Sequence, residues 1–227
     1  MERHFDEELA GVKHLLLRMG ALTEAMLGDA MRALVRNDRN LLDPIFTQEA
    51  QVNRLQIDVD EMCLRLIALH QPTASDLRFL LAVSKINTEL ERLGDEAVNI
   101  AETVTKLLAE PPLKPFDLIP QMVEIANGMV KDSLHAFVSL DAERARRVLV
   151  RDDKVDTLRD QVIAELLSYM RNDPAAIGRG MDLIIIAKKL ERIADHATNI
   201  AEDVIFVAEG KDVRHHAGEK LNPPAAS

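Results

Sequence analysis

The chain has 227 residues, of which 47% are hydrophobic and 29% charged, with no Trp and a formal net charge of −10. This charge argues against a nucleic-acid binder, because phosphate contacts need clustered Lys and Arg, and it favours cationic ligands or basic partners. The single cysteine, Cys63, excludes a disulfide framework, and no apolar run approaches the roughly 20 residues that span a bilayer. The first twenty residues are not typical of a signal peptide, so we expect a cytoplasmic, mostly helical protein.

The spacing of apolar residues predicts six long amphipathic helices and very little strand. In the second helix the apolar residues recur at steps of three and four, the spacing of helices that pack nearly side by side. They are Val52, Leu55, Val59, Met62, Leu66 and Leu69. The fifth helix has much the same pattern at Val155, Leu158, Val162, Leu166 and Tyr169. Both patterns indicate helices of a bundle.

Helix starts are marked by Asp-Pro pairs. Asp43 and Asp173 are each expected to be an N-cap, with Pro44 and Pro174 as the first helical residues. A further break at Pro72 separates the second helix from the third.

The chain divides into two halves of similar sequence. "AMRALVRND" from residue 30 aligns with "SLHAFVSLD" from residue 133, at an offset of 103. We predict an all-α fold of two tandem three-helix bundles related by internal duplication, over residues 1–110 and 116–210. The Pro-rich stretch 111–115 is the expected linker, and residues 211–227 lose the periodicity and are expected to be a disordered tail.

The most similar stretches are "LERLGDEAVNIAE" at residues 90–102 and "LERIADHATNIAE" at 190–202, with nine identities in thirteen positions. The apolar identities are explained by a packed core, but the polar ones are not. The polar identities that matter most are Glu91, Asp95 and Asn99 in the first copy, and Glu191, Asp195 and Asn199 in the second. Like charges at i and i+4 cost a helix roughly 0.2 to 0.5 kcal/mol, so their recurrence indicates a ligand-binding role.

A second polar pair lies one helix earlier in each half: Glu49 with Asn53, and Asp152 with Asp156. Neighbouring helices of a bundle are antiparallel, so each pair is expected to face an acidic pair of the next helix. Oxygen ligands of this kind suit Mg, Mn or Fe ions, whereas structural zinc would require Cys or several His. Because Asn53 replaces an acid, we expect weaker metal binding in the first bundle.

These acids could equally form a solvated helix face with surface ion pairs, and this interpretation has about as much support as a ligand-binding role. Arg92 and Arg192 each precede an Asp by three residues, at Asp95 and Asp195. His196 is expected at the surface or beside a ligand rather than as a ligand itself. Asp132 with His135 is the nearest approach to a di-iron motif and is unrepeated, and no catalytic motif is evident.

The doubled motif, the duplicated layout and the opening "FDEELAGVKHLLLRMGALTEAML" resemble the PhoU family of phosphate-uptake regulators, over residues 5 to about 208. The resemblance implies two helical bundles related by a pseudo-twofold axis, often in a homodimer, with no enzymatic activity. Such proteins repress phosphate-starvation genes when phosphate is plentiful. They bridge the ATPase subunit of the phosphate ABC transporter and the phosphate-sensing histidine kinase, and reach the membrane through these partners.

The resemblance also implies metal sites, because some members bind multinuclear clusters through Glu/Asp-x-x-x-Asp motifs. The matching positions are Glu91 with Asp95, Glu191 with Asp195, and Asp152 with Asp156. Glu49 with Asn53 departs from the motif, and Glu96 stands where the second copy has His196. The first bundle is therefore the less favourable place for a full cluster.

Three interpretations follow. The first, which we favour, is a non-enzymatic adaptor whose acidic grooves bind metal. The second is a scaffold whose acidic faces dock basic partner helices without metal. The third is a metal-dependent enzyme or a metal store unrelated to phosphate signalling, and the missing His ligands count against it.

Overall fold

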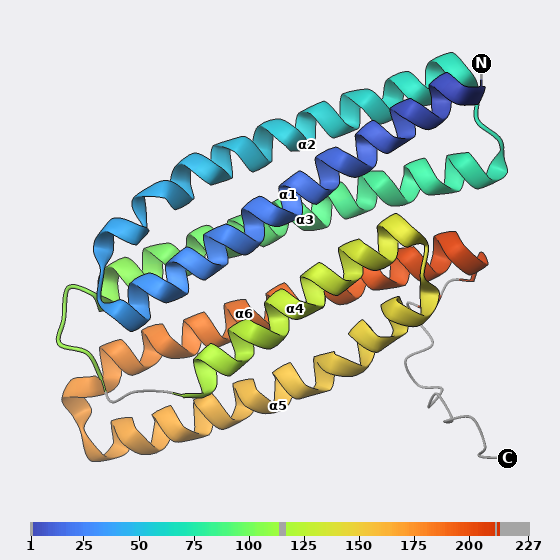
Figure 1. Ribbon diagram of the computed structural model, residues 1–227. Coiled ribbons are helices and arrows are strands. Elements are labelled where there is room, and N and C mark those ends of the chain that lie inside the picture. The colour runs from blue at the N-terminus through green and yellow to red at the C-terminus, as the bar shows by residue number, and fades with distance from the viewer. Residues whose placement is uncertain (1, 114–116, 212, 214–227) are drawn as a thin grey trace, which may run out of the picture.

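The computed structural model describes residues 2–113, 117–211 and 213, with side chains from residue 5 onward. Six long helices account for nearly all of this part of the chain, as predicted (Figure 1). They are α1 (Glu2–Arg36), α2 (Asp43–His70), α3 (Ala74–Leu107), α4 (Leu118–Ser139), α5 (Ala142–Asn172) and α6 (Ile177–Glu209). Two short 3-10 turns, η1 (Arg39–Leu41) and η2 (Pro174–Ala176), precede α2 and α6.

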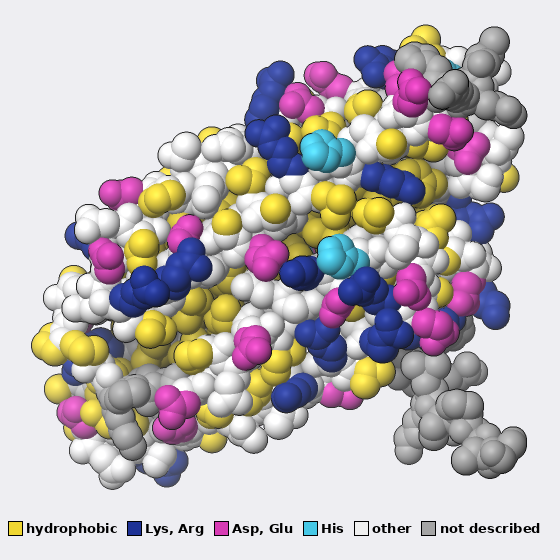
Figure 2. Space-filling view, in the orientation of Figure 1, with side chains coloured by type: hydrophobic (Ala, Val, Ile, Leu, Met, Phe, Trp, Pro, Cys, Tyr) yellow, Lys and Arg dark blue, Asp and Glu magenta, His cyan; other side chains and the backbone are white. Residues whose placement is uncertain are grey.

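The helices form two three-helix bundles. Helices α1, α2 and α3 pack on one another, as do α4, α5 and α6, so the predicted fold class is confirmed. The bundles join mainly through α3 and α6, with a smaller contact between α1 and α4, and Figure 1 shows one bundle above the other along this line. On the face with α1 and α4 in front, apolar side chains follow the boundary between the bundles (Figure 2).

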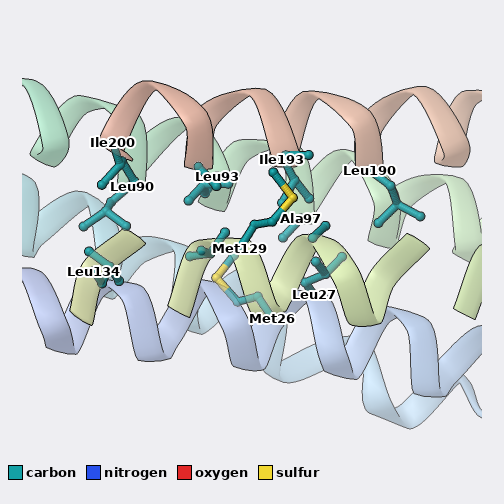
Figure 3. Packing of buried hydrophobic residues seen from close by; sticks show 14 of the residues in the cluster. Met26, Leu27, Leu90, Leu93, Ala97, Met129, Leu134, Leu190, Ile193 and Ile200 are labelled. Atoms are coloured by element: carbon teal, nitrogen blue, oxygen red, sulfur yellow. The ribbon is translucent and has the colours of Figure 1, made fainter. Parts of the chain in front are cut away.

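One hydrophobic core extends through both bundles. Figure 3 shows the part shared by the central helices: Met26 and Leu27 of α1, Leu90, Leu93 and Ala97 of α3, Met129 and Leu134 of α4, and Leu190, Ile193 and Ile200 of α6. Gly20 lets α1 approach α4 closely, because a Cβ there would meet the Leu134 side chain at 2.1 Å. The halves are thus one packed body, although each has its own helix triplet.

Some predicted details are wrong. Asp43 is the first residue of α2 and not its N-cap, because η1 leads straight into the helix through Leu42, whose φ and ψ are already helical. Asp173 does cap, but it caps η2, accepting a hydrogen bond from the Ala175 N–H, and α6 begins only at Ile177.

The apolar stripe of α2 ends earlier than predicted, because Leu69 in its last turn is 69% exposed. In α5 the predicted Tyr169 is only partly buried, and the buried stripe continues to Met170. Cys63 is a buried free thiol as expected, and burial raises its pKa to about 12.

The described part of the predicted linker, residues 111–113, contains no helix. The rest of the predicted linker, residues 114–115, lies outside the described residues, as does the predicted tail apart from residues 211 and 213. None of the described helices combines the length and the apolar character needed to cross a membrane.

Candidate functional site

The structure brings the first set of predicted site residues together between α2 and α3. Glu49 and Asn53 lie on α2 and are joined by a hydrogen bond of 2.5 Å from the Asn53 amide to a Glu49 carboxylate oxygen. Glu91 and Asp95 face them from α3. Burial raises the pKa of both carboxyls, and the charge of Glu49 raises both pKa values further. We call these four residues the first acidic cluster.

The second acidic cluster lies at the equivalent place between α5 and α6, with Asp152 and Asp156 opposite Glu191 and Asp195. Burial, followed by the charges of Asp195 and Asp156, raises the pKa of Asp152 to about 6. Burial and Glu191 also raise the pKa of Asp195. Negative charge is therefore concentrated here beyond what nearby cations neutralise.

Arg159 occupies part of the second cluster. Its guanidinium donates to Asp156 at 2.8 Å and to Glu191 at 2.6 Å, so it bridges α5 and α6. The equivalent residue of the first bundle, 103 positions earlier, is Gln56. The two clusters therefore differ by a cation that the sequence analysis did not identify.

Among the described residues, no group of three or more His, Cys, Asp or Glu side chains is already arranged to hold a metal ion. Mutual repulsion separates carboxylates that lack a cation, and Arg159 holds two of those in the second cluster. The chemistry nevertheless fits a hard cation, because the donors are carboxylate and amide oxygens that face one another across neighbouring helices.

The two repeated asparagines have other contacts. The Asn99 amide donates to the Asp95 backbone carbonyl at 2.8 Å, within its own helix. The Asn199 amide donates to a carboxylate oxygen of Glu89 at 2.9 Å, across the boundary between the bundles. Each of these hydrogen bonds therefore goes to a group other than a carboxylate of the acidic clusters.

His196 is not the surface residue that we expected. It is 7% exposed, and its Nδ1 lies 2.7 Å from a Glu89 carboxylate oxygen, where α6 packs on α3. Burial raises the pKa of Glu89, but hydrogen bonds from His196 and Asn199 outweigh it, so the net shift is downward. An ionised Glu89 needs a donor, so Nδ1 carries the proton in this pair.

A second contact between α3 and α6 mirrors the first. Glu96, which is 5% exposed, pairs with Lys189 at 2.9 Å and with Arg192 at 3.1 Å. The two arginines do form ion pairs, but not with the aspartates three residues further on. Arg192 pairs with Glu96, and Arg92 pairs with Glu89 at 3.1 Å. Both arginines therefore form ion pairs with glutamates that are buried at the boundary between the bundles.

The two contacts are related by the duplication. Position 89 corresponds to 189, and 96 corresponds to 196, so the Glu89–His196 contact maps onto the Lys189–Glu96 contact. The first copy has an acid at both positions, and the second has a base at both. The antiparallel packing of α3 on α6 therefore places an acid against a base twice, whereas two copies of α3 packed in the same way would place Glu against Glu.

The sequence contained a signal for this boundary. Residues 89 and 96 are seven apart, as are 189 and 196, and seven residues return to the same face of a helix. A comparison restricted to identities between the copies passes over these positions. A search for changes of charge sign at this spacing would have found them.

Comparison with known proteins gives a consistent result. The PhoU domain family matches residues 16–104 and 119–204, one match in each bundle. The chain is 41% identical to the "Phosphate-specific transport system accessory protein PhoU homolog" of Aquifex aeolicus, covering 94% of this chain and 97% of the relative. The homolog from Pseudomonas putida is 38% identical, with 95% and 84% coverage.

Two solved structures share the fold. One is PhoU from Pseudomonas aeruginosa, with a TM-score of 0.86 and 38% identity over 91% of this chain and all of that one. The other is the phosphate transport system regulatory protein PhoU from Streptococcus pneumoniae, also with a TM-score of 0.86, at 29% identity, covering 92% of this chain and 99% of that one.

Reversing one charge at the Glu96–Lys189 contact should destabilise the protein. We expect Lys189→Glu and Glu96→Lys each to lower the free energy of unfolding by about 2 to 4 kcal/mol, because each leaves like charges facing at a buried site. The double exchange should lose less than the sum of the two, as measured by urea denaturation. The same exchange at the exposed Arg54–Asp58 pair is the control and should change stability by less than about 1 kcal/mol. Strictly additive losses at 96 and 189 would contradict the pairing.

Stability should also respond to the ionisation of Asp152. Its pKa is about 6 in the folded protein and roughly 3.9 when unfolded, so the folded state binds this proton more tightly. The stabilisation of the folded state by this proton is complete below about pH 4 and is lost as the pH rises through about 6. With metal ions removed by a chelator, we expect Asp152→Asn to have a higher free energy of unfolding than the wild type above pH 6. The difference should be about 1 kcal/mol, because solvent screening reduces the effect of a partly exposed group. The gap should close below pH 4, and Glu165→Gln, an exposed change on the same helix, should show no such gap in thermal melts across pH.

Proposed function

The chain belongs to the PhoU family of non-enzymatic accessory and regulatory proteins, and from this premise we propose that it regulates phosphate uptake as an adaptor. In this proposal it links the ATPase subunit of the phosphate ABC transporter to the phosphate-sensing histidine kinase, and it represses the starvation response when phosphate is plentiful. It acts in the cytoplasm as a homodimer, and it reaches the membrane through these partners.

The observation that carries the proposal is the pair of equivalent acidic clusters on one rigid body. The bundles share a continuous core and are held in fixed relation by the contacts of α3 with α6. A body of this kind presents two similar surfaces at a fixed separation, as an adaptor requires. The relatives support the pathway, because those from several bacteria are named accessory proteins of phosphate-specific transport.

Metal binding at the clusters is part of the proposal. Glu49, Glu91 and Asp95, with the Asn53 amide oxygen, would hold a Mg, Mn or Fe ion in the first bundle. The four acids of the second cluster would do so in the second bundle, provided that Arg159 gives up its bridge. A bound cation would neutralise the charge that raises these pKa values and would tie neighbouring helices together.

A second candidate is a scaffold whose clusters dock basic segments without metal. Arg159 favours this alternative, because a guanidinium already provides the counter-charge that a partner's Lys or Arg would provide. Partner binding that survives chelation would select it.

The adaptor proposal predicts a specific capture result. The tagged chain should retain the transporter ATPase or the sensor kinase from membranes of phosphate-replete cells, identified by mass spectrometry. An Asp95→Asn, Asp195→Asn double variant should fold, since both changes relieve repulsion, and it should retain at least several-fold less partner. A Glu102→Gln, Asp182→Asn variant, in the same helices α3 and α6 but outside the acidic clusters, is the matched control. Failure of the wild type to retain either partner would contradict the adaptor function.

Arg159 should control the difference between the metal sites. We expect Arg159→Gln to strengthen Mn²⁺ binding at the second cluster by about tenfold, because it removes a competing cation from four acids. In the wild type the two clusters should differ by less than this. Calorimetric titration of the full chain would measure both affinities, with Arg54→Gln, an exposed change on α2, as the control. Unchanged affinities in Arg159→Gln would exclude the second cluster as a metal site.

A further inference from the structure

Each bundle carries an exposed apolar patch at the same place. Its three residues lie on the second and third helices of the bundle and are between 38% and 68% exposed. They are Leu64, Leu77 and Leu81 in the first bundle, and Leu167, Ile177 and Met181 in the second. The offsets of 103 and 100 are those of the duplication, so both copies have kept large aliphatic side chains at surface positions. No core packing accounts for them.

The alignment of α2 with α3 places the first patch on the surface that these two helices share. We call this surface the first groove, and the surface shared by α5 and α6 the second groove. The Asn87 amide donates to Asp60 at 3.0 Å, which fixes how the antiparallel helices lie against each other. Counting along both helices from this contact, Leu64 is level with Val83 and lies about half a turn from the level of Leu81. Leu77 lies one turn nearer the connection between the helices.

The patch faces the same way as the first acidic cluster. Leu77 and Asp95 are eighteen residues apart, which is about five complete helical turns, so their side chains leave α3 in the same direction. On α2, Leu64 follows Asn53 by eleven residues, or about three turns and 16 Å. The groove therefore presents an apolar end and an acidic end.

The second bundle repeats this arrangement. The Arg159–Glu191 contact aligns α5 with α6, and it brings Leu167 within about a turn of Met181. Leu167 follows Asp156 by the same eleven residues. The connections α2–α3 and α5–α6 lie at opposite ends of the molecule, so the two grooves run in opposite directions (Figure 1).

Charge decides what covers these grooves. A second copy of the chain, placed groove to groove, would bring acidic clusters together in a protein of net charge −10. A basic segment would instead place Lys or Arg side chains against the carboxylates of the clusters, which is the complementary charge. The apolar patch adds the buried contact that a purely ionic surface would not have.

We propose that each groove docks an amphipathic helix of a basic partner, with apolar residues on the patch and Lys or Arg about three turns away on the acidic cluster. The pseudo-twofold relation gives two such sites per chain and fits a partner that itself has two copies of the helix. This inference rests on the proposed adaptor function, with cationic side chains of the partner in place of a metal ion on each acidic cluster, and it supplies the chemistry of the partner's contact.

The test uses the full chain and a synthetic helical peptide of 22 residues. The peptide has Leu at i, i+3, i+4 and i+7, and Lys on the same face at i+11, i+14 and i+15. A comparison peptide of equal composition interleaves the Leu and Lys residues. Fluorescence anisotropy at physiological ionic strength measures binding and stoichiometry, and light scattering measures the mass of the protein.

We expect two peptides per wild-type chain. Leu64→Gln with Leu81→Gln should remove one site, and adding Leu167→Gln with Met181→Gln should weaken binding at least tenfold. Val35→Gln with Val150→Gln, at equally exposed positions outside the grooves, is the matched control and should have no effect. Thermal melts would check that all variants fold, since exposed substitutions change stability little.

Three results would overturn the proposal. The first is a wild-type chain that does not bind the peptide, or patch variants that bind it as tightly as the wild type. The second is equal binding of the interleaved peptide. The third is a wild-type dimer that the patch variants convert to monomers, which would make a second copy the occupant. The capture experiment separates this inference from the adaptor function. If the patch variants still retain the partner, the docking site is wrong and the adaptor function stands. If the chain binds the peptide but captures neither partner, the adaptor function is wrong and the docking site stands.

Discussion

The packing of α3 against α6 is the contact on which the rest of the structure depends. It buries two glutamates, Glu89 and Glu96, and a buried carboxylate is costly unless it is paired and hydrogen-bonded. His196 and Lys189 provide those partners from the other bundle. A third contact has the opposite sense, because the buried Asp203 of α6 pairs with Lys85 of α3 at 3.1 Å, so each bundle provides a base for an acid of the other. The two halves of the duplication have thereby become complementary rather than merely similar.

The same two helices position the acidic clusters. On α3, Glu91 follows Glu89 by two residues, so the two side chains leave the helix about 200° apart. One side of the helix is thus fixed against the neighbouring bundle, while the opposite side faces the groove with α2. The equivalent argument holds for α6. Rigid packing at the boundary therefore sets the separation of the two clusters, and a ligand or partner at one groove acts on a helix that also forms the bundle contact.

Much of this was predictable, and the part that was not has a physical cause. Periodicity predicts six helices because each helix must bury one stripe, and the repeat predicts two bundles and the convergence of acids such as Glu91 and Asp95. Periodicity on one helix does not say what a polar face will meet. Asn199 was therefore assigned to the candidate metal-binding stripe and His196 to the surface or the neighbourhood of a ligand, although both contact Glu89 more than a hundred residues away. Leu69 was assigned to the core because its spacing fits, but at the end of α2 it is exposed.

The comparison of the two clusters argues that the duplication has kept their charge rather than their residues. The first has three carboxylates, with Asn53 in the place of a fourth. The second has four carboxylates and the guanidinium of Arg159, where the first bundle has Gln56. One cluster lacks an acid and the other has gained a base, so both have the same formal charge. Burial of these acids, and then the repulsion among them, raises the pKa values of Asp95 and Asp152, so keeping them ionised opposes folding. Equal charge reached by two routes, at a cost in stability each time, is the pattern expected if both grooves receive cationic groups of the same kind.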